Sequence, residues 1–308
     1  MTTKDRVAHK NVGVNGMKGK IYLPFLLPAL VLYLLFFIVP SLASIVFSLT
    51  KWSGLGSDMS WTGIQNYVRL FASEAFRTAL LNTLTLVVVG GLGVFALSFA
   101  SMIVLRKMRG GGLIRSVIFV PYILSPIAIG VAVGFLLNPD GAVNSVLRGA
   151  GLGEFAQAWL SPEWIFRIII LGVVWSVSGF YVALMMTGVD SIPDELYESA
   201  SLAGATRWQQ FTHVTFPLTR DVLATAAVLW VINGLKVFEM VIAFTGTAGN
   251  PPIESRTVAV QQYLTFTGGR SGTAELGYAS AIGVVIFVLS SLLVILVRRL
   301  LRSEVYER

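Results

Sequence analysis

The sequence predicts an all-α integral membrane protein with six transmembrane helices and a cytoplasmic helix–turn–helix loop. Of its 308 residues, 55% are apolar and only 13% are charged, and the mean hydropathy is +0.75. A soluble domain carries about a quarter charged residues. This composition therefore indicates a chain that lies mostly in lipid.

The apolar residues gather in runs that are long enough to cross a bilayer, which takes about 20 residues in a helix. Within each run the apolar character is nearly continuous, as expected of a membrane span rather than of an amphipathic surface helix. The expected spans cover residues 22–48, 79–105, 113–137, 166–188, 222–246 and 277–300. We therefore expect an N-terminal tail (1–20), one six-span domain (21–303) and a C-terminal tail (304–308).

Lysine and arginine are distributed unequally between the two sides of the predicted membrane. Of the 23, fifteen lie in the two tails and in the connections after the second and fourth spans, whereas seven lie in the other connections. Because positive residues concentrate in cytoplasmic loops, both termini are expected in the cytoplasm. The same distribution explains the net charge of +7 without a nucleic-acid partner.

Residues for catalysis or metal binding are scarce. The absence of cysteine excludes disulfides, thiolate ligands and cysteine nucleophiles. The two histidines, His9 and His213, cannot form a multi-histidine metal site. No paired carboxylates lie within the predicted spans, so we expect neither an enzyme nor a metalloprotein.

The connection at residues 189–218 is polar and predicts two short helices on the cytoplasmic side. Ser191 to Asp194 fits a capping box, with Pro193 in the first turn, where its missing N–H costs little. The helix that follows is expected to run to about Ala203.

Gly204 is placed to end this first helix, because glycine adopts the left-handed conformation without steric cost. Thr206 to Gln209 fits a second capping box, and the second helix is expected to end before Pro217. The residues alone leave two interpretations open: a docking platform for a cytoplasmic partner, or an ordinary loop that happens to be helical.

The loop resembles the EAA loop of the permease subunits of binding-protein-dependent ABC importers. That pattern stands here as Glu198-Ser199-Ala200, followed by Gly204 and Pro217 at the family's spacing, with Ala203 in place of the usual aspartate. The resemblance implies that the loop contacts an ATPase subunit. The residues implied in this contact are Glu198, Ser199, Ala200, Gly204, Ala205, Phe211 and Pro217.

Other stretches narrow the resemblance to the sugar-importing permeases of the MetI-like fold. They are PFLLPALVLYLLFFIVP in the first span, WTGIQNYVRLF before the second, GLIRSVIFVPYILSP in the third and LKVFEMVIAFT in the fifth. The resemblance implies that the chain is no enzyme but half of a translocation pathway for a carbohydrate, of the size of a disaccharide or an oligosaccharide. It also implies a location in the plasma membrane of a prokaryote.

The implied partners are a second permease subunit, two ATPase subunits and an extracytoplasmic sugar-binding protein. ATP and magnesium are expected in the ATPase subunits, and this chain is expected to bind no cofactor itself.

Lys236 and Glu239 are the clear charges deep inside a predicted span. They are three residues apart, so a continuous helix would place them on one face. Charges inside a membrane are costly and should face a cavity or pair with each other. Two interpretations stay open: a polar site in the translocation path, or a structural pair at the interface with the second permease subunit.

Four further residues complete the candidate substrate path: Trp175, Tyr181, Asn233 and Phe238. Aromatic rings could stack on a sugar inside a cavity, although aromatic residues in spans more often serve packing or the membrane interface. In the second span, the glycines of Gly90-Gly91-Leu-Gly93 are expected to allow close helix packing.

An ion-coupled secondary carrier is the alternative function. Such carriers use intramembrane charges or discontinuous helices near the bilayer midplane. The Lys236–Glu239 pair is the feature that would support it, and no inverted repeat is apparent in the sequence.

Overall fold

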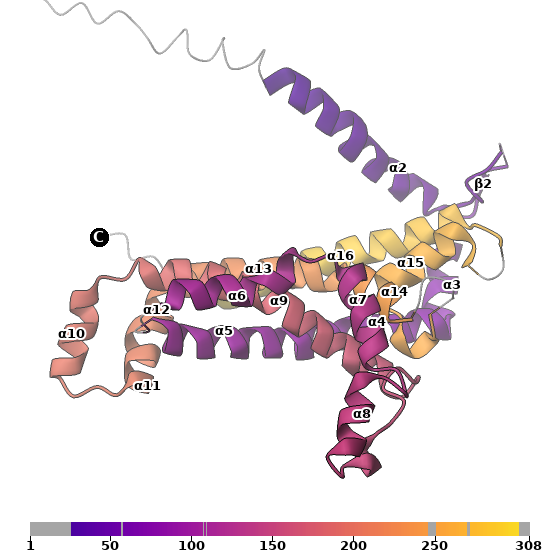
Figure 1. Ribbon diagram of the computed structural model, residues 1–308. Coiled ribbons are helices and arrows are strands. Elements are labelled where there is room, and N and C mark those ends of the chain that lie inside the picture. The colour runs from indigo at the N-terminus through magenta and orange to yellow at the C-terminus, as the bar shows by residue number, and fades with distance from the viewer. Residues whose placement is uncertain are drawn as a thin grey trace, which may run out of the picture.

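The computed structural model describes residues 26–56, 58–106, 108, 110–245, 251–269 and 272–301, and this part of the chain is mostly helical (Figure 1). Two short strands, β1 (Thr50–Lys51) and β2 (Ser60–Trp61), pair antiparallel with Thr50 opposite Trp61. The all-α prediction is confirmed. Both predicted tails (1–20 and 304–308) lie outside the described residues.

The α-helices follow one another along the chain with connections of unequal length. They are α2 (Val39–Phe47), α3 (Gln65–Ala72), α4 (Glu74–Thr85), α5 (Gly91–Leu105), α6 (Gly111–Ile123), α7 (Pro126–Leu136), α8 (Ala142–Gly149), α9 (Ile165–Asp190), α10 (Asp194–Leu202), α11 (Arg207–Gln210), α12 (Phe216–Leu218), α13 (Arg220–Leu235), α14 (Glu239–Thr245), α15 (Val258–Thr267) and α16 (Leu276–Leu301).

Four helices are long and apolar enough to cross a membrane, and they match four of the six predicted spans. They are Leu26–Phe47, Glu74–Leu105, Ile165–Asp190 and Leu276–Leu301. Two further helix pairs are bent at a short break: α6 with α7, and the helical stretch Arg207–Leu218 with α13. Counting each pair as one span gives up to six candidate spans in the described residues.

The third predicted span, 113–137, is not one helix. Helices α6 and α7 meet at 91°, and of the two residues between them Leu124 is extended and Ser125 is also non-helical. Pro126 explains the break, because the residue before a proline is driven from the helical to the extended region. The expectation of a continuous helix here is therefore wrong.

The fifth predicted span, 222–246, is also interrupted. Helix α13 ends at Leu235, and α14 begins only at Glu239. Helix α13 also meets the helical stretch before it, Arg207–Leu218, at 75°. The continuous helix expected from the apolar run is therefore wrong here too.

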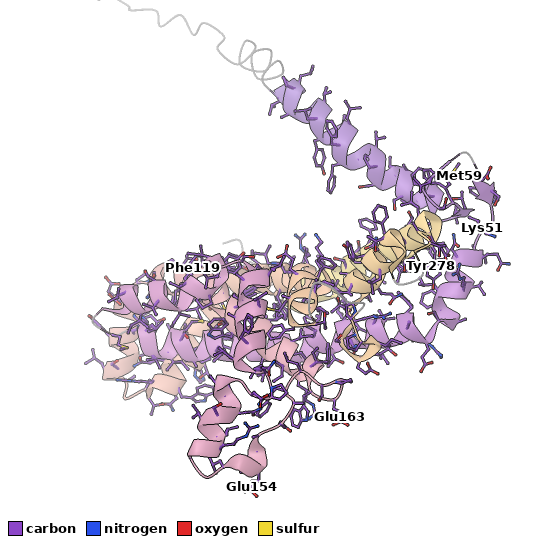
Figure 2. The ribbon with its side chains drawn as sticks, turned by 45° about the vertical axis from the view of Figure 1, so that its right-hand side comes forward. Lys51, Met59, Phe119, Glu154, Glu163 and Tyr278 are labelled. Atoms are coloured by element: carbon purple, nitrogen blue, oxygen red, sulfur yellow. The ribbon has the colours of Figure 1, made fainter. Side chains whose placement is uncertain are left out.

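Helix α9 lies at the centre of the bundle and contacts α5, α6, α13 and α14. Its most apolar window is 56% buried, against 0% for the first candidate span, which projects away from the bundle (Figure 1). Helices α10 and α11 lie at one end of the bundle, and β2, α3 and α15 lie at the other. Figure 2 shows Lys51 and Tyr278 at this second end and Glu154 at the tip of the hairpin that carries α8.

A π-helical turn, Leu86–Gly90, joins α4 to α5, and Trp230 of α13 packs against it. The indole N–H of Trp230 donates a hydrogen bond to the Val87 carbonyl oxygen at 2.7 Å. A Cβ atom on Gly91 would lie 2.5 Å from the indole nitrogen, so only glycine fits this approach. The predicted packing role of these glycines is therefore confirmed at Gly91.

Trp230→Phe should destabilise the fold, because it keeps a ring in place but removes the indole donor, so that the Val87 carbonyl retains only the Gly91 N–H. A net hydrogen bond contributes about 0.5–1.5 kcal/mol, so the thermal-unfolding temperature of the purified protein should fall. Trp175→Phe is the control, since that side chain is exposed and its indole nitrogen makes no hydrogen bond with a described residue. Equal shifts for the two variants would contradict this role of the hydrogen bond.

Candidate functional site

A cavity of about 550 Å³ lies where α6 is separated from α7 and where α13 is separated from α14, and it is called the chamber below. Helices α7 and α14, which follow the breaks, pack together so closely that a Cβ on Gly130 would lie 2.1 Å from the Cβ of Ala243. The chamber is lined by Tyr122, Pro126, Val173, Ser176, Val177, Tyr181, Trp230, Asn233, Lys236, Val237, Phe238, Glu239 and Met240. Residues from both broken runs thus face one space, together with residues of the unbroken α9.

Five of the six residues predicted for the substrate path line the chamber: Tyr181, Asn233, Lys236, Phe238 and Glu239. The sixth, Trp175, does not, and its side chain is 50% exposed. The next two residues of α9, Ser176 and Val177, do line the chamber. Because each helical residue is turned by about 100° from the last, Trp175 presents its side chain elsewhere.

Lys236 and Glu239 do not share a helix face, as they would in one continuous helix, and they form no ion pair with each other. Lys236 is the cap residue after α13, and Glu239 is the first residue of α14. Neither side chain forms an ion pair or a hydrogen bond with a described residue, and both line the chamber. Each charge suits its helix end, since cations are favoured at the C-terminus and anions at the N-terminus.

The chamber combines aromatic rings with a buried polar atom. The Tyr181 side chain is 1% exposed, and its hydroxyl makes no hydrogen bond of good geometry with a described residue, although Asn233 lies nearby. Trp230 packs edge-on against Tyr181, with ring centroids 5.9 Å apart. A buried hydroxyl without a protein partner is a site where a polar ligand or a water can bind.

Tyr122 and Trp230 line the chamber but were absent from the predicted path. Tyr122 stacks on Phe180 at 4.9 Å and lies just before the break at Pro126. The proline inside an apolar run was the signal that could have placed Tyr122 near a cavity, because irregular backbone at membrane depth is tolerated where it lines one.

The loop at residues 189–218 forms a helix–turn–helix at one end of the bundle (Figure 1). Gly204 has φ +79°, the left-handed conformation expected of it. The second capping box is confirmed: the Thr206 N–H donates to the Gln209 side chain at 2.8 Å, and the Gln209 N–H donates to the Thr206 hydroxyl at 3.3 Å.

The first capping box is wrong. Pro193 is the N-cap of α10 and provides no side-chain hydrogen bond, whereas the Ser191 hydroxyl donates to the Gly188 carbonyl oxygen at 2.7 Å. Ser191 therefore serves the end of α9 rather than the start of α10. The pattern alone could not distinguish these two ends, because only three residues separate the helices.

The second helix also runs past Pro217, contrary to expectation. A π-helical turn, Phe211–Thr215, precedes α12, and Pro217 lies in the first turn of α12. Arg207 to Leu218 is thus one continuous helical stretch, in which Pro217 follows a π-helical turn rather than starting a separate helix.

The residues predicted to contact an ATPase subunit differ in exposure. Glu198, Ser199, Gly204 and Pro217 are exposed, Ala200 and Ala205 are half-buried, and Phe211 is buried. Sequence reasoning missed Tyr197, which is buried and whose hydroxyl hydrogen-bonds the Thr215 hydroxyl at 2.8 Å. This bond joins the two helices of the loop.

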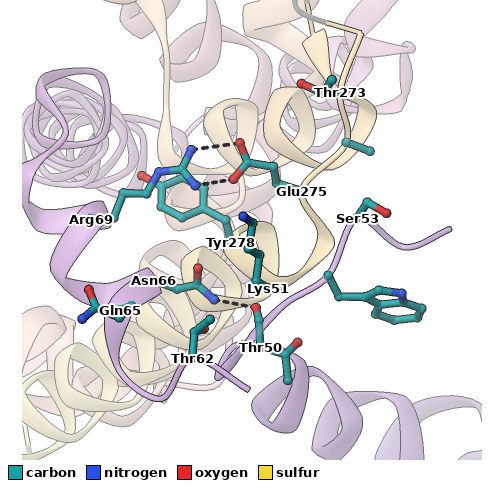
Figure 3. A pocket seen from close by; sticks show the side chains of 12 residues that line it. Thr50, Lys51, Ser53, Thr62, Gln65, Asn66, Arg69, Thr273, Glu275 and Tyr278 are labelled. Atoms are coloured by element: carbon teal, nitrogen blue, oxygen red, sulfur yellow. Dashed lines mark hydrogen bonds and ion pairs between the residues drawn. The ribbon is translucent and has the colours of Figure 1, made fainter. Parts of the chain in front are cut away.

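A second cavity, of about 530 Å³, lies at the opposite end of the bundle (Figure 3). Arg69 of α3 forms a bidentate ion pair with Glu275 and lies over the Tyr278 ring, 4.6 Å from its centroid. The hydrogen bond to Glu275 raises the pKa of Arg69.

The buried Asn66 amide donates to the carbonyl oxygens of Ser48 and Thr50, both at 2.8 Å, which fixes the end of the first candidate span.

Comparison with known proteins identifies the class. Residues 93–305 match the family of binding-protein-dependent transport system inner membrane components. The chain belongs to this family, whose members are subunits of transporters rather than enzymes. In the part of the chain that the structure describes, no cluster of three or more His, Cys, Asp or Glu could hold a metal ion.

Individual relatives cover most of the chain. The diacetylchitobiose uptake system permease protein NgcF of Streptomyces coelicolor is 30% identical over 91% of this chain and 82% of its own length. The lactose transport system permease protein LacF of Rhizobium radiobacter is 30% identical, over 87% and 90%. A chain of a bacterial ABC transporter involved in the import of the acidic polysaccharide alginate is similar in structure, with a TM-score of 0.76, 27% identity and coverage of 94% and 97%.

Because Lys236 and Glu239 are not paired, Lys236→Met and Glu239→Gln should affect the free energy of unfolding independently. The interaction energy of their double-mutant cycle should stay below about 0.5 kcal/mol. Arg69→Met and Glu275→Gln form the control cycle, and this bidentate pair should show a coupling of up to about 1 kcal/mol. A coupling between Lys236 and Glu239 as large as the control would contradict the separation seen here.

Proposed function

We propose that this chain is a permease subunit of an ATP-driven carbohydrate importer and forms half of its translocation pathway. The chamber is the observation that supports this proposal most directly. It offers aromatic faces, an unpartnered hydroxyl and an amide, which are the groups that bind the apolar faces and hydroxyls of a sugar. Its volume suits a disaccharide or a segment of an oligosaccharide, and the names of two relatives refer to the disaccharides diacetylchitobiose and lactose.

The polar end of the bundle is proposed as the point where ATP hydrolysis acts. Helix α10 is short and presents Glu198 and Ser199 to solvent. Such a helix fits a groove on another protein, and ATPase closure could then rotate the attached spans between two states. ATP and magnesium would be bound by the ATPase subunits and not by this chain.

The proposed assembly contains a second permease subunit, two ATPase subunits and an extracytoplasmic sugar-binding protein. The family description and the complex of the alginate transporter with a periplasmic protein support a binding protein as partner. We place the chain in the plasma membrane of a prokaryote with six spans, the 189–218 loop in the cytoplasm, and both tails on the same side. The excess of lysine and arginine on that side supports this orientation.

An ion-coupled carrier is the competing function. The discontinuous helices and the two unpaired charges at the chamber are features that such carriers also use. The match to a binding-protein-dependent family favours the ATP-driven importer, because an importer of that kind takes its energy and much of its selectivity from separate subunits.

Phe238→Ala should slow sugar uptake by the complete transporter in liposomes, since an aromatic contact contributes about 0.5–1.5 kcal/mol, or about two- to tenfold in affinity. The assay compares disaccharides such as lactose and diacetylchitobiose, with ATP inside the vesicles. Phe287→Ala, on an exposed part of α16, is the matched control and should leave uptake unchanged. Uptake that follows a proton or sodium gradient without ATP would overturn the proposal.

Glu198→Lys should lower the amount of ATPase subunit that co-purifies with the chain by about tenfold, because it reverses a charge on the exposed face of α10. Membrane insertion, measured as the amount of chain in the membrane fraction, should not change. Glu163→Lys makes the same change before α9, away from the 189–218 loop, and is the control. Equal losses for both variants would contradict a specific role of α10.

A further inference from the structure

We propose that two arginines, Arg106 and Arg115, position helix α10 by holding the aspartates on either side of the turn that precedes it. These four residues, Arg106, Arg115, Asp190 and Asp194, are called the arginine clamp. The inference rests on the proposed contact between α10 and an ATPase subunit. It adds that the motion of α10 reaches α5 and α6 directly, through side chains, as well as α9 through the backbone.

The first half of the clamp joins α6 to the end of α9. The Arg115 guanidinium donates to both carboxylate oxygens of Asp190, at 2.7 and 3.3 Å. The Nε atom of Arg115 is buried and has no hydrogen-bond partner among the described residues. The head group is therefore oriented by Asp190 alone, in the forked geometry that arginine forms with a carboxylate.

The second half joins the end of α5 to the start of α10. Arg106 caps α5, and its guanidinium donates to Asp194, the first residue of α10, at 2.8 Å. The same guanidinium lies over the Tyr197 ring, 3.0 Å from its centroid, and only 14% of the Arg106 side chain is exposed. Two different contacts thus fix the first turn of α10 against α5.

The turn between the aspartates leaves α10 little freedom. It consists of Ser191, Ile192 and Pro193, of which Ile192 is buried and Pro193 has a restricted backbone. One turn beyond Asp194, the hydrogen bond between the Tyr197 and Thr215 hydroxyls links α10 to the helical stretch that precedes α13. A displacement of α10 must therefore move α5, α6, α9 and α13 together or break one of these contacts.

The clamp acts through geometry rather than through stability. Ion pairs with one exposed partner contribute little to the free energy of unfolding, and the Asp194 and Asp190 side chains are 86% and 53% exposed. Arginine is required for its planar fork and for stacking on Tyr197, and lysine offers neither. Coupling between ATP hydrolysis and transport should therefore change more than stability when the clamp is removed.

The test measures sugar taken up per ATP hydrolysed, by the complete transporter with its own ATPase subunits and binding protein in liposomes. Arg106→Gln with Arg115→Gln should lower this ratio by about tenfold, in the range of known coupling free energies. The ATPase subunit should still co-purify, and the unfolding temperature should change little. Arg220→Gln is the control, because Arg220 is exposed and forms no ion pair with a described residue.

Variants that exchange the two charged residues of an ion pair distinguish a positioning role of the arginines from a general loss of structure. Arg106→Asp alone should lower the ratio, and the addition of Asp194→Arg should restore part of it. Arg115→Asp with Asp190→Arg should behave in the same way.

Three results would overturn the clamp: a ratio equal to that of Arg220→Gln, loss of the ATPase subunit from the complex, or no restoration by either reversal. A native complex that takes up no sugar with ATP would instead overturn the proposed function. The two failures are therefore distinguishable.

Discussion

A helix that breaks inside a bilayer leaves backbone N–H and C=O groups that no lipid can satisfy, and much of the structure follows from how the chain meets this constraint. Both breaks are placed at the same site, where α7 and α14 cover each other and a cavity remains between the helix ends. Irregular backbone is tolerated at membrane depth only where protein or a water-filled space surrounds it. The unbroken α9 passes beside the breaks and provides the packing that they lack.

Local signals in the sequence predicted those parts of the fold that depend on a few neighbouring residues. Thr206 and Gln209 form the expected capping box because both partners of each hydrogen bond lie within one turn. Gly204 adopts the left-handed conformation because its own backbone decides it. The composition predicted a membrane protein for a similar reason, since burial in lipid depends on the sum of side chains and not on their arrangement.

The features that sequence reasoning missed depend on contacts between distant segments. Lys236 and Glu239 do not share the helix face that the apolar run predicts, because hydropathy cannot distinguish one apolar helix from two that meet at a bend. The contact of Arg106 with Asp194 joins residues 88 positions apart, and no local pattern encodes it. From the sequence, Arg106 and Arg115 indicate only membrane sidedness, since a single sequence shows the charge of a loop and not its partner.

The first candidate span, Leu26–Phe47, buries none of its most apolar window against the rest of the chain. Its fixed point is the far end, where Asn66 binds the backbone of Ser48 and Thr50. The helix meets its own bundle near this end, where α2 contacts α16, and the rest of the helix is left to its surroundings. Without lipid or a second subunit around it, this helix would leave a long row of leucines and phenylalanines open to water. The helix therefore needs lipid or another protein to cover its apolar side chains.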